Sequence, residues 1–162
     1  MTRAHPVAAM NALELKVPPP FVALLFGLAM WLVSSLDGAT DVAFGVRVAV
    51  AIAVACVGVF FGFSAMASFV REKTTMNPIK LDTTSSLVTN GVFRFSRNPM
   101  YLSLLLYLLA WAIYLSNWLA ALLLPVFVLY INRFQITREE QALSALFGAE
   151  YDSYKARVRR WL

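Results

Sequence analysis

The sequence predicts an all-α fold, a polytopic membrane helical bundle of about four transmembrane helices followed by C-terminal amphipathic helices. The 162 residues are 60% hydrophobic and only 14% charged, with a mean hydropathy of +0.67. Soluble domains are only about half apolar, and a transmembrane helix needs about 20 mostly apolar residues. The segments that reach or approach this length are Val17–Leu36, Val42–Val70, Pro99–Leu115 and Trp118–Ile136. We therefore expect residues 1–162 to form a single membrane domain, with the helical bundle over 17–136.

The distribution of positive charge predicts the topology. Of the 14 Lys and Arg residues, only Arg47 lies near the first short connection, which also carries Asp37 and Asp41. The other basic residues precede the first segment, lie between the second and third, or follow from the end of the fourth. By the positive-inside rule, both termini and the 71–97 loop are cytoplasmic. The net charge of +5 then reflects topology and anionic headgroups, not nucleic acid.

The first two segments are expected to form an antiparallel pair. Three prolines, 18–20, suit the start of a helix, and turn-forming residues follow the first segment. In the second segment Gly58 and Gly62 form a GxxxG pattern, which favours close packing of another helix. We expect Arg47 to extend toward the outer interface and Cys56 to be a small buried apolar residue.

The polar loop 71–97 leads directly into the third helix. It contains turn formers such as Asn90-Gly91, and long irregular loops in compact bundles are usually functional. Asn98 is the predicted N-cap and Pro99 the first helical residue. A helix start on the cytoplasmic side also offers unpaired N–H groups and a positive dipole end to an anion.

The fourth segment and the tail have recognisable boundaries. Ser116 and Asn117 form the preceding turn, and Pro125 predicts a kink. The tail 137–162 is expected to be amphipathic, to lie on the inner membrane surface and to break near Gly148. Thr137 and Glu140 fit a capping box.

Several kinds of chemistry are excluded by the composition. The chain has one histidine, His5, and one cysteine, so a histidine-based metal site or a Ser-His-Asp hydrolase is not expected. Neither a Walker-type loop nor a GxGxxG after a strand occurs. We therefore expect no metal. The remaining polar groups at the predicted cytoplasmic face suit the positioning of a charged cofactor.

Two motifs carry a specific resemblance. LVTNGVFRFSRNPMY, residues 87–101, and EEQALSALFGAEYDSYKARV, residues 139–158, resemble the two signature regions of the isoprenylcysteine carboxyl methyltransferase and phospholipid methyltransferase superfamily. These are membrane enzymes that use S-adenosylmethionine (SAM). The resemblance implies SAM-dependent methyl transfer to a lipophilic acceptor, whose methylated atom is oxygen, sulfur or nitrogen.

The resemblance also implies which residues form the site. The implied cofactor-binding residues are Ser85, Ser86, Leu87, Val88, Phe93, Asn98, Pro99, Met100, Tyr101 and Glu139. If the acceptor is an amine, Tyr101 and Glu140 are the candidate bases. Where isoprenylcysteine enzymes have an arginine for the substrate carboxylate, this chain has Gln135, and Arg133 is the candidate replacement.

Two alternatives remain at this stage. A non-catalytic helical scaffold or partner subunit would use the same motifs only to cap helices. A transporter is disfavoured because the predicted spans contain no buried charge pair and no matched broken helices.

Overall fold

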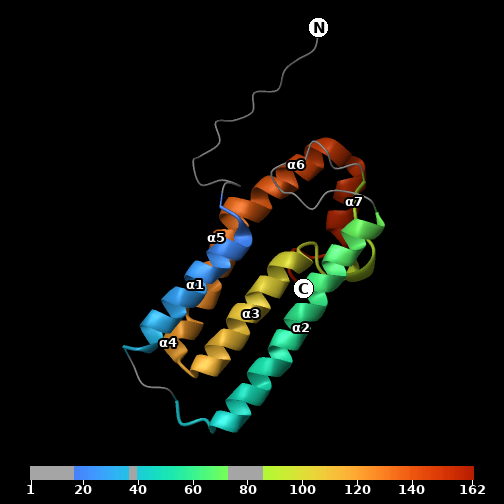
Figure 1. The fold of residues 1–162 in the computed structure, drawn as a ribbon. Coiled ribbons are helices and arrows are strands. Elements are labelled where there is room, and N and C mark those ends of the chain that lie inside the picture. Colours follow the sequence, from blue (N-terminus) through green and yellow to red (C-terminus); the bar gives the residue numbers. More distant parts are fainter. Residues whose placement is uncertain (1–16, 37–39, 73–85) are drawn as a thin grey trace.

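The structure is a computed structural model that describes residues 17–36, 40–72 and 86–162. All regular structure in these ranges is helical (Figure 1). The elements in chain order are α1 Pro19–Ser34, α2 Phe44–Arg71, η2 Gly91–Arg94, α3 Pro99–Leu115, α4 Trp118–Ala121, α5 Leu123–Ile131, η3 Asn132–Ile136, α6 Thr137–Phe147 and α7 Ala149–Arg157. The predicted all-α class is confirmed.

The long helices lie alongside one another, and α6 and α7 gather at one end (Figure 1). Helix α3 lies between α1 and α2 and contacts both, while α1 also packs on α4 and α5. The predicted third segment has the bounds of α3, and the first two shorten by about two residues at their starts. The bundle therefore centres on the helix that follows the polar loop.

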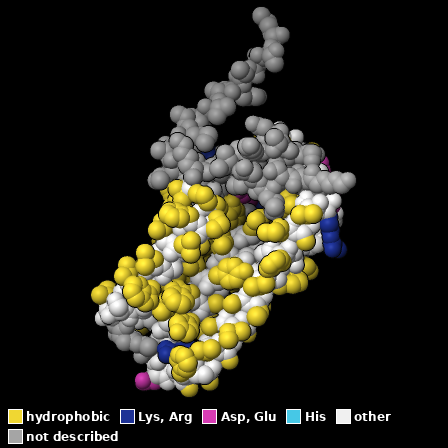
Figure 2. Space-filling view, viewed as in Figure 1, with side chains coloured by type: hydrophobic (Ala, Val, Ile, Leu, Met, Phe, Trp, Pro, Cys, Tyr) yellow, Lys and Arg dark blue, Asp and Glu magenta, His cyan; other side chains and the backbone are white. Residues whose placement is uncertain are grey.

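Two stretches are long and apolar enough to cross a membrane. They are the 28 residues of Phe44–Arg71 and the 30 residues of Trp118–Phe147, whereas α1 and α3 have 16 and 17 residues. Only 17% and 28% of the respective apolar windows are buried, unlike the core helix of a soluble protein. Apolar side chains cover the visible face along its length (Figure 2), which indicates a membrane protein.

The GxxxG pattern packs α2 against α3, as predicted. A Cβ at Gly58 would lie 3.1 Å from the Tyr107 ring, and a Cβ at Gly62 would lie 2.9 Å from Ser103 Oγ. Cys56, by contrast, is exposed on α2, so its predicted burial is wrong. An apolar helix facing lipid needs no buried side, and hydropathy does not distinguish lipid contact from protein contact.

The last long helix is interrupted without being ended. Residue 122 separates α4 from α5, where Pro125 cannot donate a hydrogen bond to the Ala121 carbonyl. The chain then passes through the π-helical turn η3 directly into α6. Ile136 has helical dihedral angles, and the Thr137 hydroxyl donates to Asn132 O at 2.6 Å. The predicted Thr137–Glu140 capping box is therefore wrong, because no helix begins there and the Glu140 side chain is used elsewhere.

Candidate functional site

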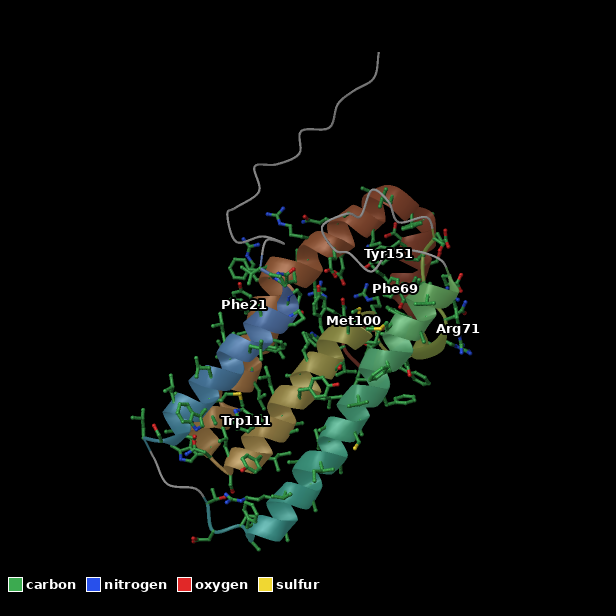
Figure 3. All side chains as sticks on the ribbon, viewed as in Figure 1. Phe21, Phe69, Arg71, Met100, Trp111 and Tyr151 are labelled. Carbon is green, nitrogen blue, oxygen red and sulfur yellow. The ribbon has the colours of Figure 1, made fainter. Side chains whose placement is uncertain are left out.

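The loop before α3 folds onto the C-terminal helices. In η2, Gly91 has φ +62°, and the Phe93 ring packs edge-on against Phe69 of α2 at 5.4 Å between centroids. Tyr154 of α7 donates from its hydroxyl to Phe93 O at 2.7 Å. Figure 3 shows Phe69, Met100 and Tyr151 gathered where α2, α3 and α7 meet. Residues far apart in the chain therefore share this end of the bundle.

Asn98 does not cap α3 with its side chain. Its Nδ2 donates to Arg160 O at 2.8 Å, and its backbone N–H donates to Ser96 Oγ at 3.1 Å. Both contacts are buried or partly buried, and the backbone N–H of Arg97 donates to Arg159 O at 3.0 Å. Asn98 does occupy the predicted N-cap position and Pro99 is the first helical residue, but the side-chain capping bond is absent because the C-terminal segment 158–162 lies against this loop and provides another acceptor. We call residues 158–162 the C-terminal strap.

Tyr101 and Glu139 form the first polar pair of the site. Tyr101 lies in the first turn of α3, and its hydroxyl donates to Glu139 Oε1 in the first turn of α6. The Tyr101 side chain belongs to the main apolar cluster of the bundle. This hydrogen bond thus joins a predicted site residue of the first motif to a predicted site residue of the second, 38 positions later in the sequence.

Glu140 forms the second polar group, with two arginines. Its Oε1 lies 3.1 Å from Arg97 Nη2 and also accepts from Arg160 Nε at 3.1 Å, while Oε2 accepts from Arg160 Nη2. The Arg97 side chain is 12% exposed, and its Nε and Nη1 are buried with no hydrogen-bond partner among the described residues. A buried guanidinium with two unused donors favours an anionic ligand.

The C-terminal strap closes this side of the site. Trp161 Nε1 donates to Asn132 Oδ1 at 3.1 Å at the start of η3, and Ser96 Oγ donates to Arg160 O at 3.4 Å. These contacts hold Arg160 beside Glu140. The strap therefore connects the loop before α3 with the π-helical turn that leads to both glutamates.

A second buried cluster, rich in tyrosine, forms where α7 and the loop before α3 pack against α2. Tyr151 and Tyr154 pack with Val88, Val92 and Phe93. Burial raises the pKa of the Tyr151 phenol to about 12, with a further contribution from the Glu140 carboxylate. Burial raises the pKa of Tyr154 as well. Both hydroxyls are therefore neutral at physiological pH.

Other predicted site residues are placed differently. Gln135 is 1% exposed and donates from Nε2 to Val17 O at 3.0 Å, and the Arg133 guanidinium lies over the Phe134 ring at 5.6 Å. These contacts do not join Gln135 or Arg133 to the polar groups of Tyr101 and Glu140. Gln135 is instead an anchor for the start of α1.

The remaining predicted residues line the loop and the start of α3. Ser86 Oγ lies at the limit of hydrogen bonding from Glu72 O, at 3.5 Å, and Leu87 is half-buried. Val88 and Pro99 are buried and Met100 is at the surface. Ser85 lies outside the described residues.

From the sequence, Arg97 counts only as one of the polar groups at the predicted cytoplasmic face that suit a charged cofactor, and Arg160, Trp161 and Tyr151 receive no site role. Arg97 belongs to the RNPMY motif, and that position was the available indication. Arg160 lies in a basic run that is typical of a membrane-surface helix, so nothing in its local sequence distinguishes it from its neighbours. Among the described residues, no group of three or more His, Cys, Asp or Glu side chains is placed to hold a metal ion.

Comparison with known proteins identifies a family whose profile matches this chain. The phospholipid methyltransferase profile matches residues 46–150. An uncharacterized protein of Haemophilus influenzae is 60% identical over 63 residues, which are 39% of this chain and all of that protein. The protein-S-isoprenylcysteine O-methyltransferase of Schizosaccharomyces pombe is 27% identical over 103 residues, 64% of this chain and 44% of that enzyme. The chain thus aligns with less than half of the yeast enzyme, and no solved structure matches.

Proposed function

Because this chain belongs to the phospholipid methyltransferase family, we propose that it transfers a methyl group from SAM to a lipophilic acceptor. The observation that carries the proposal is the joining of the two motifs. Tyr101 binds Glu139, and next to Glu139 the Glu140 carboxylate holds Arg97. This places a negative group and an incompletely paired positive group on one end of the bundle.

The side chains fit a zwitterionic cofactor. Nε and Nη1 of Arg97 have no partner in the part of the chain that the structure describes, and these donors suit a carboxylate. The Glu139 carboxylate, oriented by Tyr101, suits an ammonium group or ribose hydroxyls. SAM supplies a methyl group on a sulfonium, so that alignment is the main requirement of the transfer. We assign the aromatic contact with the cofactor to Tyr101 and Phe93, and backbone contacts to residues 85–88 and 98–100.

The two glutamates have different contacts, and we assign them different roles. Glu140 accepts from Arg97 and Arg160 and is the positioning residue that holds the Arg97 guanidinium in place. Glu139 is linked to the phenol of Tyr101, so for an amine acceptor this pair can take up the released proton. The arrangement favours the Tyr101–Glu139 pair over Glu140 as the base.

We further propose that the chain crosses the membrane four times and that the site faces the cytoplasm. This assigns α1 and α3 as short, tilted or partly interfacial spans. The basic residues of the strap and of the loop before α3 lie at the end where the site is, which accords with the positive-inside rule. The acceptor then reaches the site from the bilayer, between helices.

Isothermal titration of the purified chain with S-adenosylhomocysteine tests the proposal. We expect binding by the unaltered protein and a loss of affinity of about tenfold, or ~1.4 kcal/mol, in Glu139→Gln. Asp152→Asn is the matched control, since Asp152 is exposed and pairs only with Lys155 at 2.8 Å among the contacts described. Absence of binding by well-folded unaltered protein would overturn the proposal and favour a non-catalytic scaffold.

A further inference from the structure

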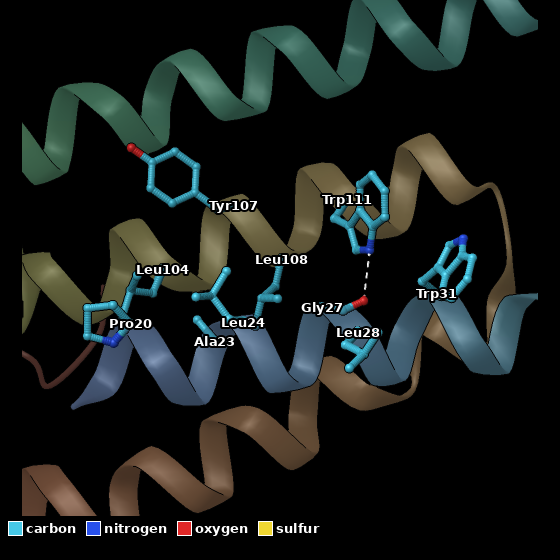
Figure 4. A pocket seen from close by; sticks show the side chains of 10 residues that line it. All are labelled: Pro20, Ala23, Leu24, Gly27, Leu28, Trp31, Leu104, Tyr107, Leu108 and Trp111. Atoms are coloured by element: carbon cyan, nitrogen blue, oxygen red, sulfur yellow. Dashed lines mark hydrogen bonds between the residues drawn. The ribbon is translucent and has the colours of Figure 1, made fainter. Parts of the chain in front are cut away.

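An apolar groove of about 690 Å³ lies between α1 and α3. Figure 4 shows its lining, which runs from Pro20 and Leu104 at one end to Trp31 and Trp111 at the other. Pro20 to Trp31 covers roughly 16 Å at about 1.5 Å per helical residue. Leu24 on its rim is 71% exposed, so the groove opens toward the membrane along its side.

The groove and the polar site are aligned along one face of α3. Tyr101, Leu104, Leu108 and Trp111 recur at intervals of three and four on α3 and so share one face of that helix. The last three line the groove, and the first bears the hydroxyl that binds Glu139. A hydrocarbon chain lying in the groove therefore has its head at the Tyr101 end of α3.

The beginning of α1 is fixed at that same end. Gln135 Nε2 donates to Val17 O at 3.0 Å, three residues before the groove begins at Pro20. Gln135 is also one helical turn before Glu139 on the same continuous helix. This one hydrogen bond thus fixes the start of α1, which forms a wall of the groove, relative to the helix that carries Glu139.

Near the opposite end, a hydrogen bond joins the two helices. Trp111 Nε1 donates to Gly27 O at 3.0 Å (Figure 4), and Tyr114 stacks on the Trp111 ring. The position of this contact limits how far a chain can extend from Tyr101 along the groove.

We propose that this groove binds one acyl chain of the membrane lipid that accepts the methyl group, and that Gly27 and Trp111 set the chain length it accepts. This inference rests on the proposed function. An acyl lipid is favoured over a prenylcysteine because Gln135 stands where isoprenylcysteine enzymes have an arginine for the substrate carboxylate, and its Nε2 donates to Val17 O at 3.0 Å. A neutral amide offers no positive charge to such a carboxylate.

Gly27→Leu is the main test variant. A Cβ at Gly27 would meet only Leu108 Cδ2, at 3.9 Å, which is ordinary van der Waals contact, so the added side chain fills groove space without moving backbone. Gly45→Leu on α2 is the matched control, because nothing lies within 4 Å of its Cβ position. Gly27→Ala adds only the methyl group and provides a milder second variant.

The probe is a long-chain lysophosphatidylethanolamine with a photoreactive diazirine at the end of its acyl chain, added to full-length protein and mapped by mass spectrometry. We expect crosslinks on α1 and α3 around Gly27 and Trp111. Gly27→Leu should lower them about tenfold, as added methylene groups in an apolar pocket do. It should also shift competition by unlabelled lysolipids toward shorter chains, with Gly27→Ala giving a smaller shift and Gly45→Leu none.

Three outcomes would overturn the inference. One is labelling spread over the exposed face of α2 and insensitive to both Gly27 variants, as ordinary annular lipid would give. Another is a chain-length preference unchanged in Gly27→Leu, and the third is displacement of the probe by a farnesylcysteine analogue but not by acyl lysolipids. Titration with S-adenosylhomocysteine is run in parallel. If the unaltered protein does not bind S-adenosylhomocysteine, the proposed function is contradicted. The crosslinking map tests binding in the groove separately.

Discussion

The two ends of α3 are built in different ways. At its start, Tyr101 and the preceding Arg97 are held by directional contacts with Glu139 and Glu140. Further along, α3 meets α1 and α2 through apolar packing, with the Trp111–Gly27 hydrogen bond as an inter-helix polar contact. On the proposed function, the charged contacts position the cofactor and the reacting groups, whereas the apolar surface selects a hydrocarbon chain by its length and volume.

Removing Glu140 is expected to give the largest effect on the polar end. Glu140→Ala leaves the mostly buried Arg97 guanidinium without its carboxylate partner. It also removes the carboxylate that holds Arg160 of the strap. Breaking a buried ion pair costs ~3–5 kcal/mol, and because Arg160 is partly exposed we expect about 2–3 kcal/mol here. The melting temperature in detergent should fall by several degrees.

Glu150→Ala is the control for this prediction, since it removes an exposed acid from α7. It should leave the melting temperature close to that of the unaltered protein. An equal, small change in both variants would show that the Arg97–Glu140–Arg160 group does not hold the strap.

Enlarging Gly62 tests the apolar packing of α3 in the same way. A Cβ at this position would lie 2.9 Å from Ser103 Oγ, so Gly62→Leu forces α2 and α3 apart at a cost of ~1–3 kcal/mol. Thermal denaturation measures the loss. Gly45→Leu again serves as the control, and equal stability of both variants would contradict close packing through the GxxxG pattern.

Raising the pH should give the smallest effect, confined to the tyrosine cluster. The pKa of Tyr151 is raised from 10.0 to about 12. A raised phenol pKa stabilises the folded state fully below pH 10, and this contribution is lost as the pH rises from 10 to 12. Ultraviolet titration should show one late-ionising phenol fewer in Tyr151→Phe than in the unaltered protein, where the pKa of Tyr154 is raised as well. If the phenol lost in Tyr151→Phe ionises near pH 10, the ordinary value for tyrosine, its burial beside Glu140 is contradicted.

The sequence predicted the helices well because membrane-length hydropathy is a local property. The bounds of α3, the packing role of Gly58 and Gly62 and the break at Gly148, which has φ +49°, follow from neighbouring residues. The two candidate spans and the exposed apolar surface support the membrane assignment.

What the sequence could not predict were contacts between distant segments. Asn98 has the residue type of an N-cap, but the strap residue Arg160 offers its side chain a carbonyl 62 positions away. Likewise, local spacing suggested a capping box for Glu140. The helix is instead continuous through η3, and the Glu140 carboxylate pairs with Arg97 and Arg160. Motif resemblance selected Tyr101 and Glu139, but their hydrogen bond required the fold.

The most direct test of the central claim is methyl transfer itself. Membranes containing the protein are incubated with SAM labelled in its methyl group, and the lipid fraction is separated and identified. We predict that a lipid acquires the label, that Tyr101→Phe slows transfer about tenfold through loss of its hydrogen bond to Glu139, and that Asp152→Asn does not. If folded, membrane-inserted protein transfers no label to any lipid or other lipophilic molecule, the account of this site as a methyltransferase centre is contradicted.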